Sequence, residues 1–382
     1  MPPVSIMVKP VSGSCNMRCS YCFYADELTR RASGTLPVMD KSTLENLLRR
    51  TFFYGDECVY LAFQGGEPTL AGAEYFRQVL ALERTYNTRS IPVHHAIQTN
   101  GLCLNDDLLS VLREGRFLVG LSLDGTKRIH DSRRLDVCGN GTWDRSLKTA
   151  GALKCAGIPY NVLCVVDAAV AEHPKEVFES LAPHGFLQFI PCLDPLWTPC
   201  GTNSLSAHAY GSFLIEVYRQ YAHCLRHGRY VSIRAFDNWL NMLWGQSPEH
   251  CGFSGQCAPS FVIESNGDVY PCDFYALDDW LLGNINQTSF SRLANSPKLM
   301  EFLRRSAAEN PDCTACAYRF LCHGGCARDR EPAHPGESLG KNRLCAGYQM
   351  FFDACLPDMR LLCSQLRKAP CRPETQKPRR RP

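Results

Sequence analysis

Residues 14–22 read SCNMRCSYC and place three cysteines, Cys15, Cys19 and Cys22, in a C-x3-C-x2-C spacing. The segment follows the apolar run VSIMVKPV at residues 4–11, so we expect a loop after a first β-strand. Three thiolates at this spacing can hold a four-iron cluster and leave one iron without a protein ligand. Such an iron can chelate a small molecule. Three buried cysteines, or a zinc site completed by a distant histidine, are the alternative interpretations.

Apolar, β-rich runs alternate with helix-like segments through the first two hundred residues. After residues 4–11 the runs are VYLAFQGG (59–66), VHHAIQTNG (93–101), FLVGLSLDG (117–125), YNVLCVVD (160–167) and FLQFIPCLD (186–194). Most are nearly continuous apolar stretches, which is typical of strands buried on both faces. Six β-then-α units predict a parallel sheet with right-handed crossovers, either an open sheet or a partial barrel.

Polar, glycine-rich motifs follow several of these predicted strands. They are QGGEP at 64–68, QTNG at 98–101, SLDG at 122–125 and CLDP at 192–195. In barrels and open α/β sheets, ligands bind at the carboxyl ends of the strands. The motifs therefore predict the ligand-binding edge of the sheet.

The pattern changes after about residue 230, where we expect a second, smaller domain at 231–350 after a first domain at 1–230. FVIESNGDVYPCDF at 261–274 indicates a β-hairpin that turns through Asn266 and Gly267. A helical segment is expected at 289–307, and a cysteine-dense, loop-rich stretch follows it. Residues 351–382 are expected to form a C-terminal helix and a disordered tail.

Eight cysteines fall in this second domain, enough to ligate two further four-iron clusters. They are Cys251, Cys257, Cys272, Cys313, Cys316, Cys322, Cys326 and Cys345. Small residues around them, as in CHGGC at 322–326, would let the backbone wrap a cluster and hydrogen-bond its sulfurs. A zinc knuckle built on Cys313 and Cys316 is the alternative.

Composition narrows the class of protein. No stretch approaches the roughly 20 apolar residues of a membrane helix, and the N-terminus lacks the charged and apolar regions of a secretory signal. We therefore expect a cytoplasmic protein without a membrane partner. In that reducing compartment the 22 cysteines indicate metal or redox chemistry and not a disulfide framework.

The formal charge of +3 comes from the chain's end. Residues 367–382 hold seven Lys or Arg and one acidic residue, and the rest of the chain has 34 basic against 37 acidic residues. The body is near neutral, so no nucleic-acid partner is expected.

C-x3-C-x-aromatic-C followed by Gly-Gly-Glu resembles the radical S-adenosylmethionine (SAM) superfamily. The resemblance implies a partial (β/α)6 barrel and SAM bound at the cluster of Cys15, Cys19 and Cys22. It assigns SAM contacts to Tyr21 beside the adenine, to Gly65, Gly66 and Glu67 at the amino acid end, and to Ser122, Arg134 and Leu193. A strand-end turn and a core leucine are the alternatives for Ser122 and Leu193. Arg133 is the neighbouring alternative to Arg134.

The pattern of the eight later cysteines resembles the SPASM domain of peptide-modifying radical enzymes. That resemblance implies two auxiliary iron–sulfur clusters. One would be held by Cys251, Cys257, Cys272 and Cys326, and the other by Cys313, Cys316, Cys322 and Cys345.

Across nearly the whole chain, FQGGEPTLAG, IQTNG, FLVGLSLDG and VYPCDFYALDDW are similar to the anaerobic sulfatase-maturating enzymes. The family oxidises a Cys or Ser in a sulfatase Cys/Ser-x-Pro/Ala-x-Arg motif to Cα-formylglycine. The resemblance makes Asp273 the general base and Tyr24 and Gln64 candidates to grip the peptide. Because side chains alternate along a strand, we expect Asp273 to point away from the cluster of Cys272.

The implied partners are an unfolded or nascent sulfatase and an electron donor such as ferredoxin or flavodoxin. In the implied reaction a 5′-deoxyadenosyl radical removes hydrogen from the substrate Cβ, and an auxiliary cluster takes the second electron. Another SPASM peptide maturase, forming a thioether or a crosslink, is the nearest alternative function. A zinc-stabilised scaffold without enzymatic activity is the alternative from a different class.

Overall fold

The computed structural model describes residues 3–34, 36–197, 204–332 and 337–368. Its main feature is a curved parallel sheet. Six strands run parallel in the order β1 (Val4–Val8), β3 (Val59–Phe63), β4 (Val93–Thr99), β5 (Leu118–Ser122), β7 (Tyr160–Val166) and β8 (Phe186–Pro191). Each lies within a predicted apolar run, so the six-strand prediction is confirmed.

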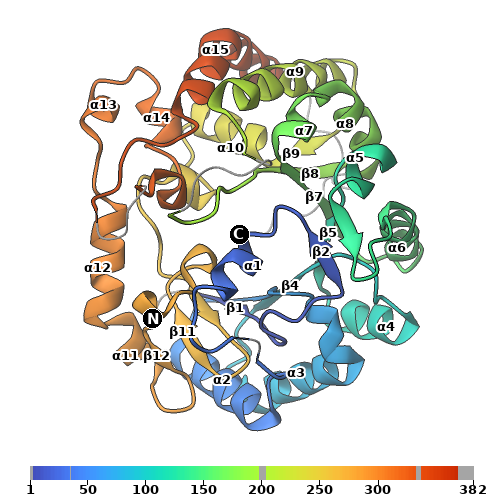
Figure 1. The fold of residues 1–382 in the computed structure, drawn as a ribbon, viewed down its shortest axis with the longest axis vertical. Coiled ribbons are helices and arrows are strands. Elements are labelled where there is room, and N and C mark those ends of the chain that lie inside the picture. The colour runs from blue at the N-terminus through green and yellow to red at the C-terminus, as the bar shows by residue number, and fades with distance from the viewer. Residues whose placement is uncertain (1–2, 35, 198–203, 333–336, 369–382) are drawn as a thin grey trace.

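Helices cover the outer face of this sheet (Figure 1). They are α2 (Lys41–Tyr54), α3 (Gly72–Tyr86), α4 (Asp106–Glu114), α5 (Lys127–Asp131), α6 (Trp143–Cys155), α7 (Ala168–Ala171), α8 (Pro174–Leu181) and α9 (Ala207–Arg226). The short helix α1 (Phe23–Leu28) instead lies inside the curve of the sheet. In the described chain β12 and β9 are the two ends of the sheet and do not pair, so the barrel is partial.

The sheet continues without a break into the second half of the chain. β9 (Ser232–Ile233) joins β8, and β10 (Phe261–Ile263) pairs in parallel with β1. β11 (Asp268–Tyr270) and β12 (Gly283–Asn284) follow as antiparallel strands. The predicted hairpin is confirmed, with its turn at Gly267, where φ is +90°. The predicted domain limits are not marked by a gap in the sheet.

The helical segment predicted at 289–307 is divided into α11 (Phe290–Ala294) and α12 (Pro297–Ser306). The division has a local cause. Ser296 caps α12, since its hydroxyl accepts a hydrogen bond from the Leu299 N–H at 3.2 Å. Pro297 then occupies the first helical position, where its missing N–H costs nothing. In the cysteine-dense stretch that follows, the described residues form the short helices α13 (Pro311–Thr314) and α14 (Arg319–Cys322) and the 3₁₀ turn η6 (Ala327–Arg330).

A last helix, α15 (Cys345–Lys368), packs along α9 and against α10 (Arg234–Leu243). The predicted C-terminal helix is therefore present, but it begins at Cys345 and not at residue 351. The basic tail and its Cys371 lie outside the described residues. No helix in the described chain is long and apolar enough to cross a membrane.

Candidate active site

The three-cysteine segment lies between β1 and α1 and contains a short strand that the sequence did not predict. β2 (Met17–Cys19) pairs antiparallel with β6 (Arg134–Asp136), and Cys19 lies opposite Arg134 in that ladder. Cys22 is the N-cap residue of α1 and is exposed, whereas Cys15 and Cys19 are half-buried. The ladder therefore links the segment to the region beyond β5.

The glycines of QGGEP hold this segment against β3. The Gly66 N–H donates to the Ser12 carbonyl at 2.7 Å, and the Glu67 N–H donates to the Ser14 carbonyl at 2.8 Å. A Cβ on Gly66 would lie 2.1 Å from the Ser14 oxygen, and Gly65 has a φ of +123°. Only glycine permits this approach. The close backbone approach expected here is thus made to the cysteine segment.

Glu67 is fixed at the carboxyl end of β4. One carboxylate oxygen accepts hydrogen bonds from the hydroxyls of Thr69 (2.6 Å) and Thr99 (2.7 Å). The other accepts from the Asn100 N–H at 2.7 Å. Burial raises the pKa of the Glu67 carboxyl above its usual value, although these hydrogen bonds oppose that shift. Its contact with the amino group of SAM stays a prediction.

The contacts of Arg133 and Arg134 show which of the two arginines lies beside Tyr21. The Tyr21 hydroxyl donates to the Asp124 carboxylate and accepts from an Arg134 guanidinium nitrogen at 2.7 Å. Arg133 points elsewhere and forms a buried ion pair with Asp167. Of the two arginines, it is therefore Arg134 that lies beside Tyr21, and its contact with SAM stays a prediction.

Ser122 and Leu193 complete the predicted cofactor set. Ser122 is the last residue of β5, and Leu193 follows the end of β8 by two residues. Both are half-buried. Together with QGGEP after β3, they lie at the predicted carboxyl edge of the sheet. Their contacts with SAM stay predictions.

Asp273 does not lie on a strand, so the alternation argument for its direction was wrong. β11 ends at Tyr270, and Asp273 begins the 3₁₀ turn η4 (Asp273–Tyr275). It nevertheless points toward the barrel residues. One carboxylate oxygen lies 2.7 Å from the Lys9 ammonium, and the other accepts a hydrogen bond from the Gln64 amide at 2.9 Å.

Lys9 was missed by the sequence reasoning. It follows β1 directly, its side chain is 0% exposed, and its ammonium lies 3.5 Å from the centre of the Tyr24 ring. Burial opposes its charge, but Asp273, Tyr24 and Glu264 outweigh that effect and raise the pKa of Lys9. A lysine within the apolar run VSIMVKPV was the available signal, since a buried lysine needs a partner.

Glu264, just after β10, joins the cysteine segment to the hairpin. It accepts hydrogen bonds from the hydroxyls of Tyr24 and Ser12, both at 2.5 Å, and from Arg31 at 2.8 Å. Burial opposes its ionisation, but Lys9 and Arg31 prevail and lower the pKa of Glu264. The Tyr24 hydroxyl is thus used within the protein, and its contact with a peptide stays a prediction.

Glu27, on the same face of α1 as Tyr24, is a second buried acid. Its carboxylate has no hydrogen-bond partner among the described residues. Burial raises the pKa of Glu27 to about 8, against a usual value of 4.5. Glu27 is therefore neutral over much of the physiological pH range.

The first predicted auxiliary set gathers near the hairpin. Cys251 begins the 3₁₀ turn η3 (Cys251–Phe253), Cys272 precedes η4, and Cys326 precedes η6 (Ala327–Arg330). Burial raises the pKa of Cys326 most, and Cys251 and Cys257 lie close enough to raise it further. Burial likewise raises the pKa of Cys272, with Cys326 the next contributor. Cys326 is therefore within electrostatic range of the other three cysteines of this set.

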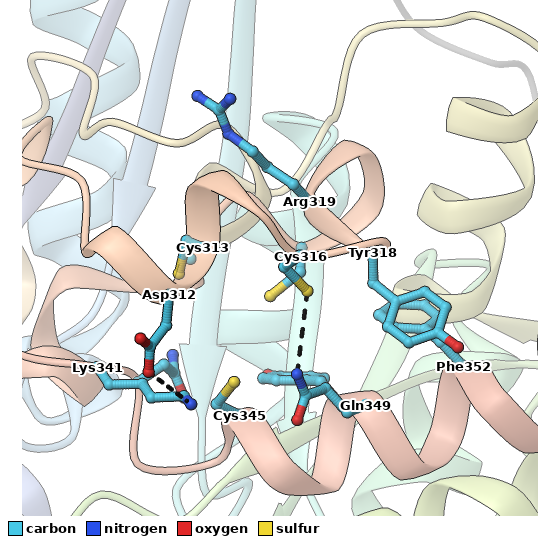
Figure 2. A pocket seen from close by; sticks show the side chains of 13 residues that line it. Asp312, Cys313, Cys316, Tyr318, Arg319, Lys341, Cys345, Gln349 and Phe352 are labelled. Atoms are coloured by element: carbon cyan, nitrogen blue, oxygen red, sulfur yellow. Dashed lines mark hydrogen bonds and ion pairs between the residues drawn. The ribbon is translucent and has the colours of Figure 1, made fainter.

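The second predicted set lines one pocket (Figure 2). Its cysteines are Cys313, Cys316, Cys322 and Cys345. The Gln349 amide donates to the Cys316 sulfur at 4.0 Å, and Lys341 pairs with Asp312 at 3.1 Å at the rim. Three thiols from residues 313–322 and one from the start of α15 surround one space, and such a donor set fits an iron–sulfur cluster.

A further observation concerns disulfides. None of the twenty cysteines that the structure describes forms a disulfide.

Comparison with known proteins identifies the family. Residues 10–181 match the radical SAM superfamily, and residues 251–317 match the SPASM iron–sulfur cluster-binding domain. A cysteine-type anaerobic sulfatase-maturating enzyme of Clostridium novyi is 39% identical, over 92% of this chain and 95% of its own length. The chain belongs to the anaerobic sulfatase-maturating enzymes. A serine-type sulfatase-maturating enzyme of Klebsiella aerogenes is 30% identical, over 94% of this chain and 86% of its own.

A solved structure of a sulfatase-maturating enzyme has the same fold. It is titled native anSMEcpe with bound AdoMet and Cp18Cys peptide, and it is 36% identical with a TM-score of 0.91. The match covers 96% of this chain and all of that one. SuiB of Streptococcus suis, with 15% identity and a TM-score of 0.65, shares the fold alone.

These matches confirm the predicted fold class and family, and they make the chain a radical SAM enzyme with a SPASM domain. Its cofactors are accordingly SAM, a 4Fe–4S cluster and additional iron–sulfur clusters.

Proposed function

We propose that the protein oxidises a cysteine or serine side chain of a sulfatase polypeptide to Cα-formylglycine, within a Cys/Ser-x-Pro/Ala-x-Arg motif. The observation that carries the proposal is the position of Asp273, whose two carboxylate oxygens are held by Lys9 and Gln64. A carboxylate fixed in this way, in a turn that contacts α1 and directly follows Cys272 of the first auxiliary set, can act as a general base.

The cofactors would be held by the predicted residues. Cys15, Cys19 and Cys22 would hold the cluster that binds SAM. Tyr21, Gly65, Gly66, Glu67, Ser122, Arg134 and Leu193 would contact SAM. Cys251, Cys257, Cys272 and Cys326 would hold one auxiliary cluster, and Cys313, Cys316, Cys322 and Cys345 the other. When bound, these groups supply a 5′-deoxyadenosyl radical for hydrogen abstraction and an acceptor for the second electron.

The residues of the chain supply the proton chemistry. Asp273 accepts the thiol or hydroxyl proton of the substrate after the Cβ hydrogen is lost, and Gln64 orients its carboxylate. Loss of that proton and of one electron leaves a C=S or C=O bond. A thioaldehyde then adds water and releases hydrogen sulfide, whereas a serine substrate gives the aldehyde directly. Tyr24 and Gln64 are the proposed peptide contacts.

The proposed partners follow from this chemistry. The target residue lies in the active site of a folded sulfatase, so the substrate is an unfolded or nascent sulfatase in the cytoplasm. A ferredoxin or flavodoxin would deliver the electron that cleaves SAM.

Anaerobic reconstitution with iron and sulfide tests the proposal. The enzyme is given reductant, SAM and peptides carrying Cys-x-Pro-x-Arg or Ser-x-Pro-x-Arg, and mass spectrometry with an aldehyde trap identifies the products. We expect an aldehyde in at least one peptide. The Asp273→Asn variant should retain its iron and lose about 100-fold or more of aldehyde formation, the range of a general base.

Two outcomes would contradict parts of the proposal. Formation of 5′-deoxyadenosine without a change in either peptide would refute the substrate and favour another peptide maturase. Unchanged aldehyde formation in Asp273→Asn would remove Asp273 from the mechanism and leave the activity standing.

A further inference from the structure

Two buried cations, Lys9 and Arg31, pair with the same buried acid, but only Lys9 also contacts Asp273. Lys9 and Arg31 both have side chains that are 0% exposed, and both form ion pairs with Glu264, at 3.9 Å and 2.8 Å. The Lys9 ammonium also lies 2.7 Å from the Asp273 carboxylate. Arg31 instead donates a second hydrogen bond, to the Tyr24 hydroxyl oxygen at 3.0 Å. Arg31 is therefore a matched control for Lys9, because both are buried cations paired with Glu264.

The Lys9 ammonium is fixed from more than one side. The Tyr24 ring lies 3.5 Å from it, and a cation held over an aromatic face is attracted by the ring. Lys9 follows β1 and Gln64 follows β3, so two neighbouring strands of the barrel hold the two oxygens of Asp273. The backbone of Asp273 belongs to the turn after β11, on the SPASM side. The ion pair between Lys9 in the barrel and Asp273 in the SPASM region fixes the direction of the Asp273 carboxylate.

We propose that Lys9 is a positioning residue for Asp273, and this inference rests on the proposed function. The ammonium holds the carboxylate in the orientation in which it receives the substrate proton, while Lys9 itself exchanges no proton. Without Lys9, Asp273 would keep its hydrogen bond from Gln64 but would be a buried carboxylate without the ion pair that Lys9 provides. Such a group is costly to keep in place, so it would turn away. Formation of the radical, which involves neither residue, would continue.

The test compares Lys9→Met with Arg31→Met in the full-length reconstituted enzyme. Aldehyde and 5′-deoxyadenosine are measured in the same reaction, together with bound iron and thermal stability. Both variants remove a buried charge next to Glu264, so both should lower stability. Only Lys9→Met should lose aldehyde formation, by about 100-fold as for loss of a general base. It should keep forming 5′-deoxyadenosine, so the ratio of 5′-deoxyadenosine to aldehyde should rise by about the same 100-fold.

A double-mutant cycle separates positioning from a general structural effect. If Lys9 acts through Asp273, then Lys9→Met should cause no further loss of aldehyde in an Asp273→Asn background. Additive losses would overturn the inference, as would equal uncoupling in Arg31→Met. If Lys9→Met does not retain its iron, Lys9→Gln is measured in its place with the same criteria.

The inference and the proposed function fail in different ways. A wild-type enzyme that forms no aldehyde refutes the proposed function. A wild-type enzyme that forms aldehyde, together with a Lys9→Met enzyme that forms as much, refutes only the role of Lys9.

Discussion

Gly66 lies so close to the cysteine segment that one methyl group would displace the chain. We expect Gly66→Ala to lose the iron of the SAM-binding cluster, because the new Cβ would lie 2.1 Å from the Ser14 oxygen. Iron content after anaerobic reconstitution measures this loss. Gly151→Ala is the control, since it lies in helix α6 with no atom within 4 Å of the new Cβ. That substitution should leave iron unchanged and stabilise the protein by about 0.5–1 kcal/mol.

Glu27 should make stability depend on pH. Its pKa is raised from 4.5 to about 8, so between these values the folded protein holds a proton that the unfolded chain releases. The stabilisation that this proton provides is full below pH 4.5 and is lost as the pH rises through 8. Between these values the free energy of unfolding falls by about 1.4 kcal/mol per pH unit.

Glu27→Gln removes this dependence, because the amide does not titrate. The difference in melting temperature between Glu27→Gln and the wild type should therefore move in favour of the variant from pH 6 to pH 8.5. Melting curves of the reconstituted proteins at the two values check this. A difference that stays constant would show that Glu27 is ionised in the folded protein.

For single residues, the sequence predicted which residues belong to the site better than it predicted which residues contact one another. The three-cysteine set was predicted from its spacing and the two auxiliary sets by resemblance. The second auxiliary set lines one pocket, and the ligation of each cluster stays a prediction. The Lys9–Asp273 contact joins residues 264 positions apart in the chain, so no local pattern could reveal it. The side chains of Arg133 and Arg134 point in different directions. Arg134 belongs to the β2–β6 ladder, whereas Arg133 precedes it and forms a buried ion pair.

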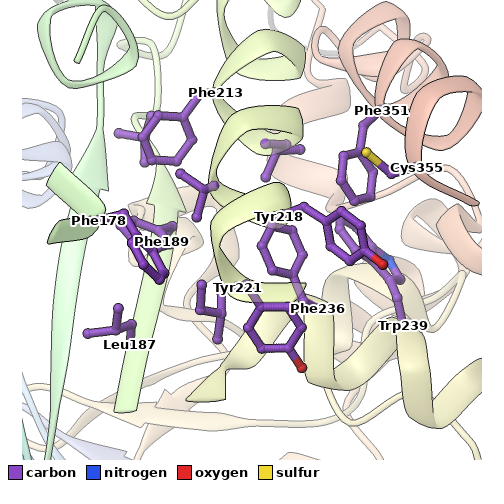
Figure 3. Packing of buried hydrophobic residues seen from close by; sticks show 14 of the residues in the cluster. Phe178, Leu187, Phe189, Phe213, Tyr218, Tyr221, Phe236, Trp239, Phe351 and Cys355 are labelled. Carbon is purple, nitrogen blue, oxygen red and sulfur yellow. The ribbon is translucent and has the colours of Figure 1, made fainter. Parts of the chain in front are cut away.

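Helix α15 illustrates how an element can support a site from outside it. Its first residue is Cys345 of the second auxiliary set, and its seventh, Phe351, packs into the core shown in Figure 3. There Phe351 stacks on Phe236 with ring centres 5.6 Å apart, and it contacts Trp239 at 5.1 Å. The position of Cys345 therefore depends on this aromatic packing.

Phe351→Ala should lower the free energy of unfolding by about 3–5 kcal/mol, because it empties a fully buried site. Leu361→Ala on the same helix is the control. Leu361 is 52% exposed, so its substitution should change stability by less than about 0.5 kcal/mol. Chemical denaturation followed by circular dichroism measures both, and equal losses would contradict the packing described here.

Long, periodic elements were predictable, and short ones were not. The six barrel strands have five to seven residues each and lie within longer, mostly apolar runs of the sequence. β2 and β6 have three residues each and no periodicity to detect. The break at Ser296 and Pro297 was visible in principle as a capping residue followed by proline. The turn at Asp273 ended a predicted strand early, and its direction came from partners distant in the chain.

At the scale of the molecule, the ten-stranded sheet makes the barrel and the hairpin of the SPASM region one body. β10 pairs with β1 over Ile6–Phe261, Met7–Val262 and Val8–Ile263. Glu264 then adds buried contacts across the same junction. The two regions matched by different families thus share one sheet.

We expect the β1 and β10 amides to open together. Hydrogen exchange measured by mass spectrometry should show similar protection in peptides covering 4–8 and 261–263, because strands of one sheet open as a cooperative unit. Far faster exchange in β10 than in β1 would show that the hairpin opens independently of the barrel.

The pairing of β1 with β10 also sets an order of events during synthesis. One side of the first strand can be covered once β3 is made, but its other side must wait for residues about 250 positions later. At roughly 5–20 residues per second, that edge stays open on the ribosome for about 10–50 s. An unpaired strand edge invites pairing with another chain. The nascent polypeptide should therefore need shielding by a chaperone until its own hairpin emerges.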